Sequence, residues 1–305
     1  MYKTVIVVSL TLLFTLLFTG AGYAFYLYHV TSASVDNMNK EYRQDTPQDL
    51  QKTSSLRGAQ LFLLIGTADR PGEPALADVI MIMSINPKDE STMLFNIPRD
   101  TQVDIPGRPH KEKINHAYSY GGADFIQEIT EKKLGHSFDF IVEVDMDGFT
   151  EVVDAVGGIE VENSFSFSQN NLTNSVTHHF EKGNIRLDGE EALHYVRMRK
   201  QDPRGDLGRN ERQRQVLSAL LKKGTSLKGI LHSDDVVTIL GERMKTNLTM
   251  SDINTLFTDY RASLNYIRTF ELEGKNERHQ DISYYMVPTE EWTKASLRIE
   301  NHQAK

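Results

Sequence analysis

The sequence predicts an α/β or α+β fold in which helices cover both faces of a sheet. Short, continuous apolar runs bounded by turn residues are typical of strands that are buried on both faces. Stretches with helical periodicity alternate with these runs through most of the 305 residues. Hydrophobic residues make up 39% of the chain and charged residues 25%, which is a globular balance and excludes wholesale disorder. Mixed strands and helices therefore pack as layers around one sheet.

The expected strands follow from apolar runs and from alternation. LFLLIG (61–66), VIMIMSI (79–85) and TMLFNI (92–97) are apolar runs, and NPKDES forms the turn between the second and the third. FDFIVEVDM alternates, as a half-buried strand does. This segment spans residues 138–146. Further strands are expected at IEVE (159–162), near 267–272 and near 282–287.

The expected helices are marked by their ends. The helix at 122–134 stops at Gly135, a typical C-terminal glycine, and Asp147 is expected to cap a helix that stops at Gly157. LDGEEALHYVR (187–197) starts with an aspartate cap and an acidic first turn. Two more helices are expected at 209–223 and near 250–261. In the first of them an interior stripe has i, i+3, i+4 and i+7 spacing and consists of Gln213, Val216, Leu217 and Leu220.

The N-terminal run at 5–30 contains no charged residue and, at 1.5 Å per residue, is long enough to cross a hydrocarbon core of about 30 Å. A cleaved signal peptide is the alternative, because Gly22 and Ala24 form a small-x-small pattern. We expect a short cytoplasmic tail (1–4), a transmembrane signal anchor (5–30), a juxtamembrane stalk (31–59) and an extracytoplasmic domain (60–305). The packed part of that domain is expected to end near Pro288. The expected location is the cell membrane, as a single-pass type II protein.

The composition excludes several chemistries. The chain has no cysteine, which excludes disulfides, cysteine-ligated zinc and a thiol nucleophile. With 34 basic and 42 acidic residues the net charge is −8, which argues against nucleic acid as a partner. The histidines, His116, His178 and His179 among them, lack zinc-binding spacing, and no P-loop, G-x-G-x-x-G or G-x-S-x-G motif is present.

Residues 197–214 form a local exception to this acidity. Seven cations face three anions here, so the segment is +4 and the rest of the chain is −12. Six of the seven are arginines, whose planar fork binds phosphate oxygens in pairs. We expect Arg197, Arg199 and Arg209 to bind an anion near a helix N-terminus, with Gln213 one turn further on. Arg212 and Arg214 are expected to be solvated.

Two further features point to the same site. Arg99 and Asp100 follow a buried strand, where side chains often point into a crevice. Asp69 and Asp78 bracket the loop between the first two strands. Carboxylates near arginines and a bound phosphate suggest Mg²⁺, which takes one or two carboxylates plus phosphate oxygens. For each aspartate alone, a turn or cap role is the alternative.

These residues resemble the LytR–CpsA–Psr family, the wall glycopolymer transferases of Gram-positive bacteria. The resemblance covers most of residues 60–220 and weakens beyond about 245. The matching pieces occur in the order of the family. They are the apolar N-terminus, SINP (84–87), NIPRDT (96–101), KINHAYSYGG (113–122), VDAVGGIEV (153–161), LDGEEALHYVRMRKQDPRGDLGR (187–209) and RQRQV (212–216).

The resemblance implies a membrane-anchored α-β-α sandwich around a mixed central sheet, on the outer side of the cytoplasmic membrane. Its members move an anionic glycopolymer, such as teichoic acid or capsule, from undecaprenyl pyrophosphate to peptidoglycan through a phosphodiester bond, with Mg²⁺ assisting. The pyrophosphate-binding residues map to Arg99, Arg197, Arg199, Arg209 and Gln213, and the catalytic ones to Arg99, Asp100 and Asp206. The polyprenyl tail is held in an apolar tunnel. The stripe that continues from Gln213 is expected either to line that tunnel or to be ordinary core.

The sequence departs from the family at the metal site. Members read G-x-D-x-R and then G-R-[SA]-D, whereas this chain reads GTADR and ALAD. Asp78 is kept, but Ala68 replaces the first aspartate and Leu76 the arginine, while Asp69 comes one place late. Because neighbouring side chains in a strand point to opposite faces, rescue by Asp69 requires a rearranged loop.

Alternative functions follow from this departure and from the cations. The chain is expected to be a phosphotransferase, with Mg²⁺ held by Asp78 and Asp69. The alternatives are a polyprenyl-pyrophosphate-binding paralogue with little or no activity, and a lipid pyrophosphatase that uses water as the acceptor. A DNA-binding regulator would use the arginine-rich segment, but the anchor and the net charge disfavour it.

Overall fold

The computed structural model describes residues 33, 39–40, 56–70, 72–171, 175–224, 239, 242–279 and 281–305. The predicted anchor at 5–30 and nearly all of the stalk lie outside these residues, as do the side chains of Asp69 and Arg70. Within the described part, no helix has both the length and the apolar character needed to cross a membrane.

A mixed six-stranded sheet forms the centre, in the order β11-β6-β1-β2-β3-β12. Its strands β1, β2 and β3 are consecutive and antiparallel, whereas β6 pairs with β1 in parallel and β12 pairs with β3 in parallel. β11 pairs with β6 in antiparallel fashion. The strand bounds are β1 Gln60–Arg70, β2 Glu73–Asn86, β3 Ser91–Asn96, β6 Phe140–Val144, β11 Met244–Thr246 and β12 Ile267–Thr269.

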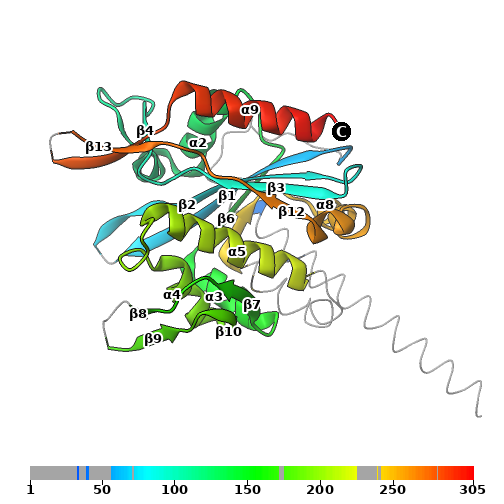
Figure 1. Cartoon of the computed structure of the whole chain (residues 1–305). Coiled ribbons are helices and arrows are strands. Elements are labelled where there is room, and N and C mark those ends of the chain that lie inside the picture. The colour runs from blue at the N-terminus through cyan, green and yellow to red at the C-terminus, as the bar shows by residue number, and fades with distance from the viewer. Residues whose placement is uncertain are drawn as a thin grey trace, which may run out of the picture.

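Helices cover both faces of this sheet, as the alternating pattern predicts (Figure 1). On one face lie α2 (Ile114–Leu134) and α9 (Thr289–Gln303). On the other lie α3 (Met146–Ala155), α4 (Gly189–Arg197) and α5 (Asp206–Gly224). The alternation of the strands separates two cores: Leu61 and Leu63 pack with the first layer, whereas Phe62 belongs to the core on the second face.

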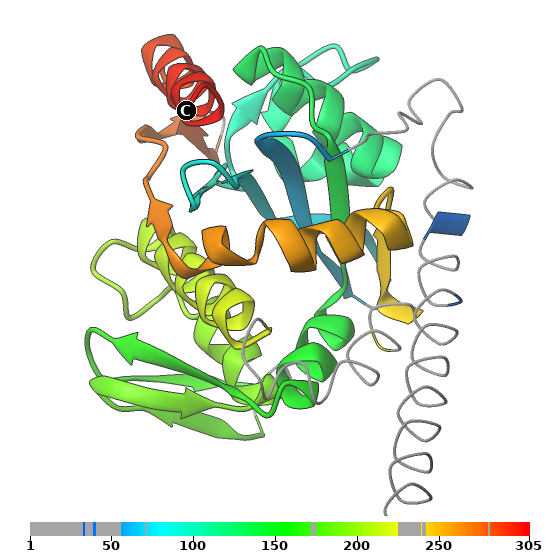
Figure 2. The same ribbon diagram turned by 90° about the vertical axis from the view of Figure 1, so that its right-hand side faces the viewer.

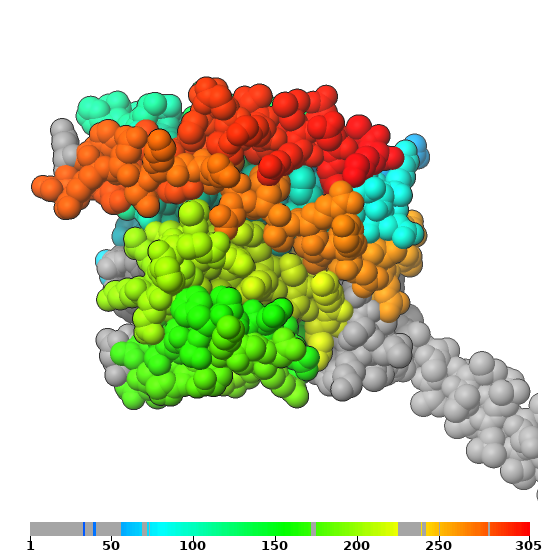
Figure 3. Space-filling model, in the orientation of Figure 1, coloured from blue at the N-terminus to red at the C-terminus, as the bar shows by residue number. Residues whose placement is uncertain are grey.

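The C-terminal segment corrects the expectation that packing ends near Pro288. α9 begins directly after that residue, and Trp292, Ala295 and Ile299 are buried in the core that includes Leu61. Figure 3 shows α9, in red, along the upper edge of the molecule. The hydrophobic spacing of Trp292, Ala295 and Ile299 is that of one helix face, so the signal was present in the sequence.

Helix ends follow local chemistry, with one shift from the prediction. Asp145, and not Asp147, caps α3, because its side chain accepts a hydrogen bond from the backbone N–H of Gly148. Asp188 caps α4 in a capping box with Glu191, and Gly135 ends α2 in the left-handed conformation, both as predicted. α2 starts earlier than predicted and is kinked where the backbone of Gly121 and Gly122 leaves the helical region.

Smaller elements surround the layers. Four two-stranded sheets are present in the described part: β4 (Gln102–Val103) with β5 (Glu112–Lys113), β7 (Ile159–Asn163) with β10 (Gly183–Leu187), β8 (Phe167–Asn170) with β9 (Thr177–Phe180), and β13 (Lys275–His279) with β14 (Ile282–Met286). Helix α8 (Met250–Asp259) and the 3-10 turn η2 (Arg261–Asn265) lie beside the sheet (Figure 2). Of these sheet strands, β7 and β14 match predicted ranges.

Candidate active site

A cavity of about 1310 Å³ lies between the sheet and the layer of α3, α4 and α5. Most of its wall is apolar and comes from the even-numbered face of β1, the facing side of β2 and the inner stripe of α5. The apolar lining includes Phe62, Leu64, Met81, Met83, Val216, Leu217, Leu220 and Leu221. The predicted stripe of α5 therefore lines a large apolar space and does not fill it.

Charged residues gather in the same cavity. Six of the nine predicted site residues line it, namely Asp78, Arg99, Arg197, Arg199, Arg209 and Gln213. They come from β2, from the loop after β3, from the end of α4 and from the start of α5. The cavity thus combines a cationic region with a long apolar wall. This arrangement is complementary to a lipid that has an apolar chain and a phosphate headgroup.

A β-bulge directs Asp78 into the cavity. Gly66 pairs with Val79 and Thr67 with Ala77, so Asp78 is the extra residue of β2. In a regular strand Asp78 and Val79 would point to opposite faces. Here both line the cavity, while Ala77 packs in the core beneath α2.

Arg99 forms an ion pair with Asp78, whose Oδ1 lies 2.5 Å from Nη1 of the arginine. Burial lowers the pKa of Arg99, but the charges of Asp78, Asp100 and Asp206 outweigh burial and raise it. Its Nε atom is buried and has no hydrogen-bond partner among the described residues. A donor without a partner beside a cavity is costly unless a ligand accepts from it, so this group fits an anion.

Arg209 lies deeper, with 8% of its side chain exposed. Burial, and then the positive charge of Arg99, lower its pKa to about 10, so the guanidinium is still charged near neutral pH. Its Nη2 lies 2.8 Å from Asp206, which also binds Nε of Arg199 at 3.1 Å. The Nε atom of Arg209 has no hydrogen-bond partner in the described part of the chain.

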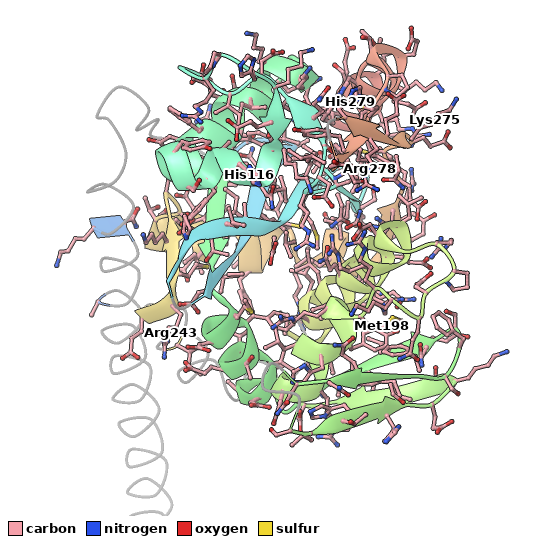
Figure 4. All side chains as sticks on the ribbon, turned by 90° about the vertical axis from the view of Figure 1, so that its left-hand side faces the viewer. His116, Met198, Arg243, Lys275, Arg278 and His279 are labelled. Carbon is pink, nitrogen blue, oxygen red and sulfur yellow. The ribbon has the colours of Figure 1, made fainter. Side chains whose placement is uncertain are left out.

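Arg197 and Arg199 both line the cavity, as their two-residue spacing predicts. Met198 between them is extended and 1% exposed, and it packs in a core cluster with Tyr195 and Val216 while also bordering the cavity. Figure 4 shows Met198 in the layer of α4, on the other side of the sheet from His116 of α2. The four arginines outnumber Asp78 and Asp206, the two carboxylates with which members of the cluster pair, and this excess of positive charge suits an anionic ligand.

Arg212 and Arg214 are buried, so the expectation that they are solvated was wrong. Arg212 binds Asp202 at 2.5 Å and donates to the carbonyl oxygens of Tyr195 and Met198. This contact ties the end of α4 to α5 and so positions the arginines between them. The sequence did not separate these arginines from their neighbours, because all of them lie in one charged run.

Gln213 and Arg214 dock α5 on β3. Asn96 donates to Oε1 of Gln213 at 3.0 Å and accepts from Arg214 at 3.1 Å. Arg214 also pairs with Glu271. This buried network fixes the start of α5 over the sheet, and Arg209 lies one turn before it.

Asp100 and Asp206 lie at the margin of the site. Asp206 contacts Arg199 and Arg209, whereas Asp100 pairs with Lys113 at 2.7 Å and is not among the residues that line the cavity. The side chain of Asp69, the ninth predicted residue, lies outside the described residues.

Comparison with known proteins decides the family. The LytR_cpsA_psr family model matches residues 24–300. The chain belongs to the LytR–CpsA–Psr family. A curated relative from Oceanobacillus iheyensis, the polyisoprenyl-teichoic acid–peptidoglycan teichoic acid transferase TagU, is 38% identical over 301 residues, which is 95% of this chain and 92% of the relative.

Solved structures agree with this assignment. TagV of Bacillus subtilis has a TM-score of 0.71 at 32% identity, over 82% of this chain and 99% of TagV. TagT bound to LIIa-WTA has a TM-score of 0.67 at 28% identity, over 84% of this chain and 96% of TagT. The mixed central sheet described above is therefore the fold of the LytR–CpsA–Psr family.

The departure of this LytR–CpsA–Psr member at Ala68 is visible in the cavity wall. Ala68 is 3% exposed, lines the cavity and pairs with Leu76 across β1 and β2. A second register shift follows between Ala68 and Arg70, so the backbone is irregular at Asp69. Of the two aspartates that the sequence analysis proposed as metal ligands, Asp78 is the one whose side chain lies within the described residues.

Two histidines without zinc-binding spacing in the sequence lie together in the fold. His178 and His194 stack with ring centroids 4.5 Å apart, and Glu190 contacts both rings. Sequence spacing did not reveal this set because β9 and α4 are separate elements that meet only in the folded LytR–CpsA–Psr domain.

Proposed function

We propose that this protein is a phosphotransferase that moves an anionic glycopolymer of the teichoic acid or capsular type from undecaprenyl pyrophosphate to peptidoglycan. The observation that carries the proposal is the single cavity that joins an arginine cluster to a long apolar wall. Its relatives include a polyisoprenyl-teichoic acid–peptidoglycan teichoic acid transferase, whose name supports the same substrate classes.

The geometry suits an extended lipid with a charged head. Arg99 and Arg209 each carry a buried Nε that is without a hydrogen-bond partner in the described residues, and both border the cavity. Arg197 and Arg199 add two more charges. The isoprenoid chain would lie against Phe62, Leu64 and the stripe of α5, where each buried CH₂ contributes about 0.8 kcal/mol.

The reaction is a displacement at phosphorus. A hydroxyl oxygen of a peptidoglycan muramic acid attacks the phosphorus on the sugar side, and the bond from that phosphorus to the bridging oxygen breaks. Undecaprenyl phosphate leaves with the bridging oxygen, the hydroxyl proton is released, and a phosphodiester remains. The arginines neutralise charge that builds on the leaving phosphate, which is the main catalytic contribution in phosphoryl transfer.

The residues of this site suit a Mg²⁺ ion that is held mainly by the substrate phosphates. Mg²⁺ commonly binds through one or two carboxylates together with substrate phosphate oxygens. Asp78 supplies one carboxylate and Ala68 supplies none, so the residues suit an ion that arrives largely on the pyrophosphate. Bound there, the ion would neutralise phosphate charge. Asp69 is the second carboxylate proposed as a ligand of this ion.

The proposed location is the outer face of the cytoplasmic membrane, with residues 5–30 as the single type II anchor. The charge-free run of that segment supports the anchor, and a lipid-linked substrate requires access to a membrane. Protease digestion of intact cells tests it, since cleavage of the domain from outside is expected.

The activity is tested with the full chain in detergent, a polyprenyl-pyrophosphate-linked teichoic acid precursor, Mg²⁺ and a peptidoglycan acceptor. A phosphodiester-linked product is expected. Arg99→Ala is expected to lower the rate by about 100-fold or more, the usual cost of removing one charge-stabilising donor. The control is Arg298→Ala, an exposed arginine on α9. If no linked product forms, or if Arg99→Ala matches the control, the proposal is wrong.

The buried Ala68 favours one second candidate, a lipid-binding paralogue with little turnover. That protein would bind undecaprenyl pyrophosphate through intact arginines and give no product in the same assay. A lipid pyrophosphatase would instead release the free glycan phosphate without a peptidoglycan acceptor.

A further inference from the structure

We propose that His178, Glu190 and His194 form a Zn²⁺ site that fastens the β8–β9 hairpin to α4. The site lies outside the arginine cluster, and it does not depend on the proposed transferase activity. Its residues come from β9 and α4, which are separated in the sequence by β10.

The three ligand atoms are spaced for a single ion. Nε2 of His178 lies 3.5 Å from Oε1 of Glu190, and Nε2 of His194 lies 3.7 Å from the same oxygen. All three atoms lie within 4.8 Å of one another. Tetrahedral zinc with ligands at 2.0–2.1 Å requires neighbouring ligand atoms about 3.3 Å apart. Rotation of the two imidazole rings toward the carboxylate would therefore close the set around an ion.

Local structure explains why these side chains converge. Glu190 and His194 are four residues apart in α4 and so lie on the same face of the helix. His178 and His179 are neighbours in β9, so only one of the two points toward α4. His194 has 5% of its side chain exposed and His178 has 14%, whereas Glu190 has 62%.

An ion pair between Glu190 and one histidine does not explain why two imidazole rings and a buried ring nitrogen gather at one carboxylate. One carboxylate serves two stacked imidazoles, and Nε2 of His178 is buried with no hydrogen bond to any described residue. A neutral ring nitrogen is the form that binds a metal.

The donor set selects the metal class. Two imidazole nitrogens and one carboxylate suit zinc, whereas Mg²⁺ and Ca²⁺ prefer oxygen ligands. A neighbouring cavity of about 390 Å³, lined by His194 and Glu190 among others, leaves room for water as the fourth ligand. Because zinc lies in the plane of each imidazole that binds it, the 25° angle between the rings is expected to open on binding.

The position of the site gives it a role. β8, the partner of β9, contributes Ser168, Gln169 and Asn170 to the wall of the main cavity. His194 lies one turn before Arg197, which reaches the same cavity. An ion shared by β9 and α4 would hold this hairpin and this arginine in fixed relative positions. The residues are thus positioning residues for the main site.

The test measures Zn²⁺ binding to the metal-free full chain in detergent, by calorimetry and elemental analysis. A single tightly bound Zn²⁺ per chain is expected. His178→Ala and Glu190→Gln are each expected to weaken binding by about 100-fold or more, since losing even a group that only orients a ligand costs 10–100-fold. His179→Ala is the matched control, because His179 is the neighbour in β9 and bonds to Ser168.

Two further readouts keep the test independent of folding defects. Co²⁺ bound to the wild-type chain is expected to show the visible absorption of a tetrahedral site, which Glu190→Gln removes. Zn²⁺ is also expected to slow hydrogen exchange in β9 of the wild-type chain. The proposal is overturned if the wild-type chain binds no Zn²⁺, or if His178→Ala and Glu190→Gln bind it as tightly as His179→Ala.

Discussion

Asp78 places its Oδ1 2.5 Å from Nη1 of Arg99, so one carboxylate belongs to the arginine cluster and to the predicted metal site at once. A cation that binds Asp78 must compete with this guanidinium. The buried methyl group of Ala68 offers no second carboxylate nearby. In the proposed metal site, Asp78 would therefore divide its charge between Arg99 and the ion.

Ala68→Asp is expected to strengthen Mg²⁺ binding. A second carboxylate beside Asp78 adds attraction to a divalent ion, and in a partly buried site this is worth at least about a tenfold lower Mg²⁺ midpoint. The midpoint is measured from transfer rate against Mg²⁺ concentration. Ala68→Asn is the control, with the same shape and no charge. Equal midpoints for the two variants would show that this position does not face the metal.

Arg209→Ala is expected to weaken binding of undecaprenyl pyrophosphate by about 10- to 150-fold, the value of one hydrogen bond to a charged group. Arg209→Lys is expected to recover only part of this loss, because lysine lacks the planar fork. Titration of the lipid into the full chain in detergent measures both. Arg298→Ala serves as the control, and a loss of the same size there would point to a general effect of charge.

Gly208→Ala is expected to destabilise the fold by about 1–3 kcal/mol or more, as overpacking does. A Cβ at Gly208 would clash with Oδ2 of Asp202, the carboxylate that holds Arg212. Gly224→Ala, in the same helix, meets nothing within 4 Å and is the matched control. Urea unfolding compares the two, and equal stabilities would contradict the packing described here.

Protonation of His302 is expected to destabilise the domain in mild acid. His302 bridges Ser84 and Ser91 at 2.8 and 3.1 Å, and burial lowers its pKa from 6.5 despite the opposing charge of Asp89. The unfolded chain then binds the proton more readily than the folded one. Stability is therefore complete above pH 6.5 and falls as pH decreases toward the lower folded pKa, by at most about 1.4 kcal/mol per pH unit for one proton.

His302→Gln is expected to reduce the dependence of the free energy of unfolding on pH. Thermal or urea unfolding between about pH 5 and 7 in EDTA measures this slope. Part of the slope remains, because the pKa of His194 is lowered in the same direction. His110→Gln, at an exposed position, is the control. An unchanged slope in His302→Gln would assign the acid sensitivity to other groups.

Much of the fold was predictable because the signals are local. The apolar runs of β1, β2 and β3 and the aspartate cap of α4 depend on residues that are neighbours in the chain. The arginine-rich segment and its contrast with a −8 chain are also properties of the sequence alone. They pointed to the arginines that line the cavity and, through motif order, to the family.

Only the tertiary structure decided which charged residues face the cavity. Arg209 and Arg212 lie three residues apart in one helix, yet the first lines the cavity and the second is tied to Asp202. The bulge turns Asp78 away from the core, and His178 meets His194 across two elements. The reason is physical: a side chain's direction follows its local backbone, but its partner is supplied by distant segments that approach only when the layers pack.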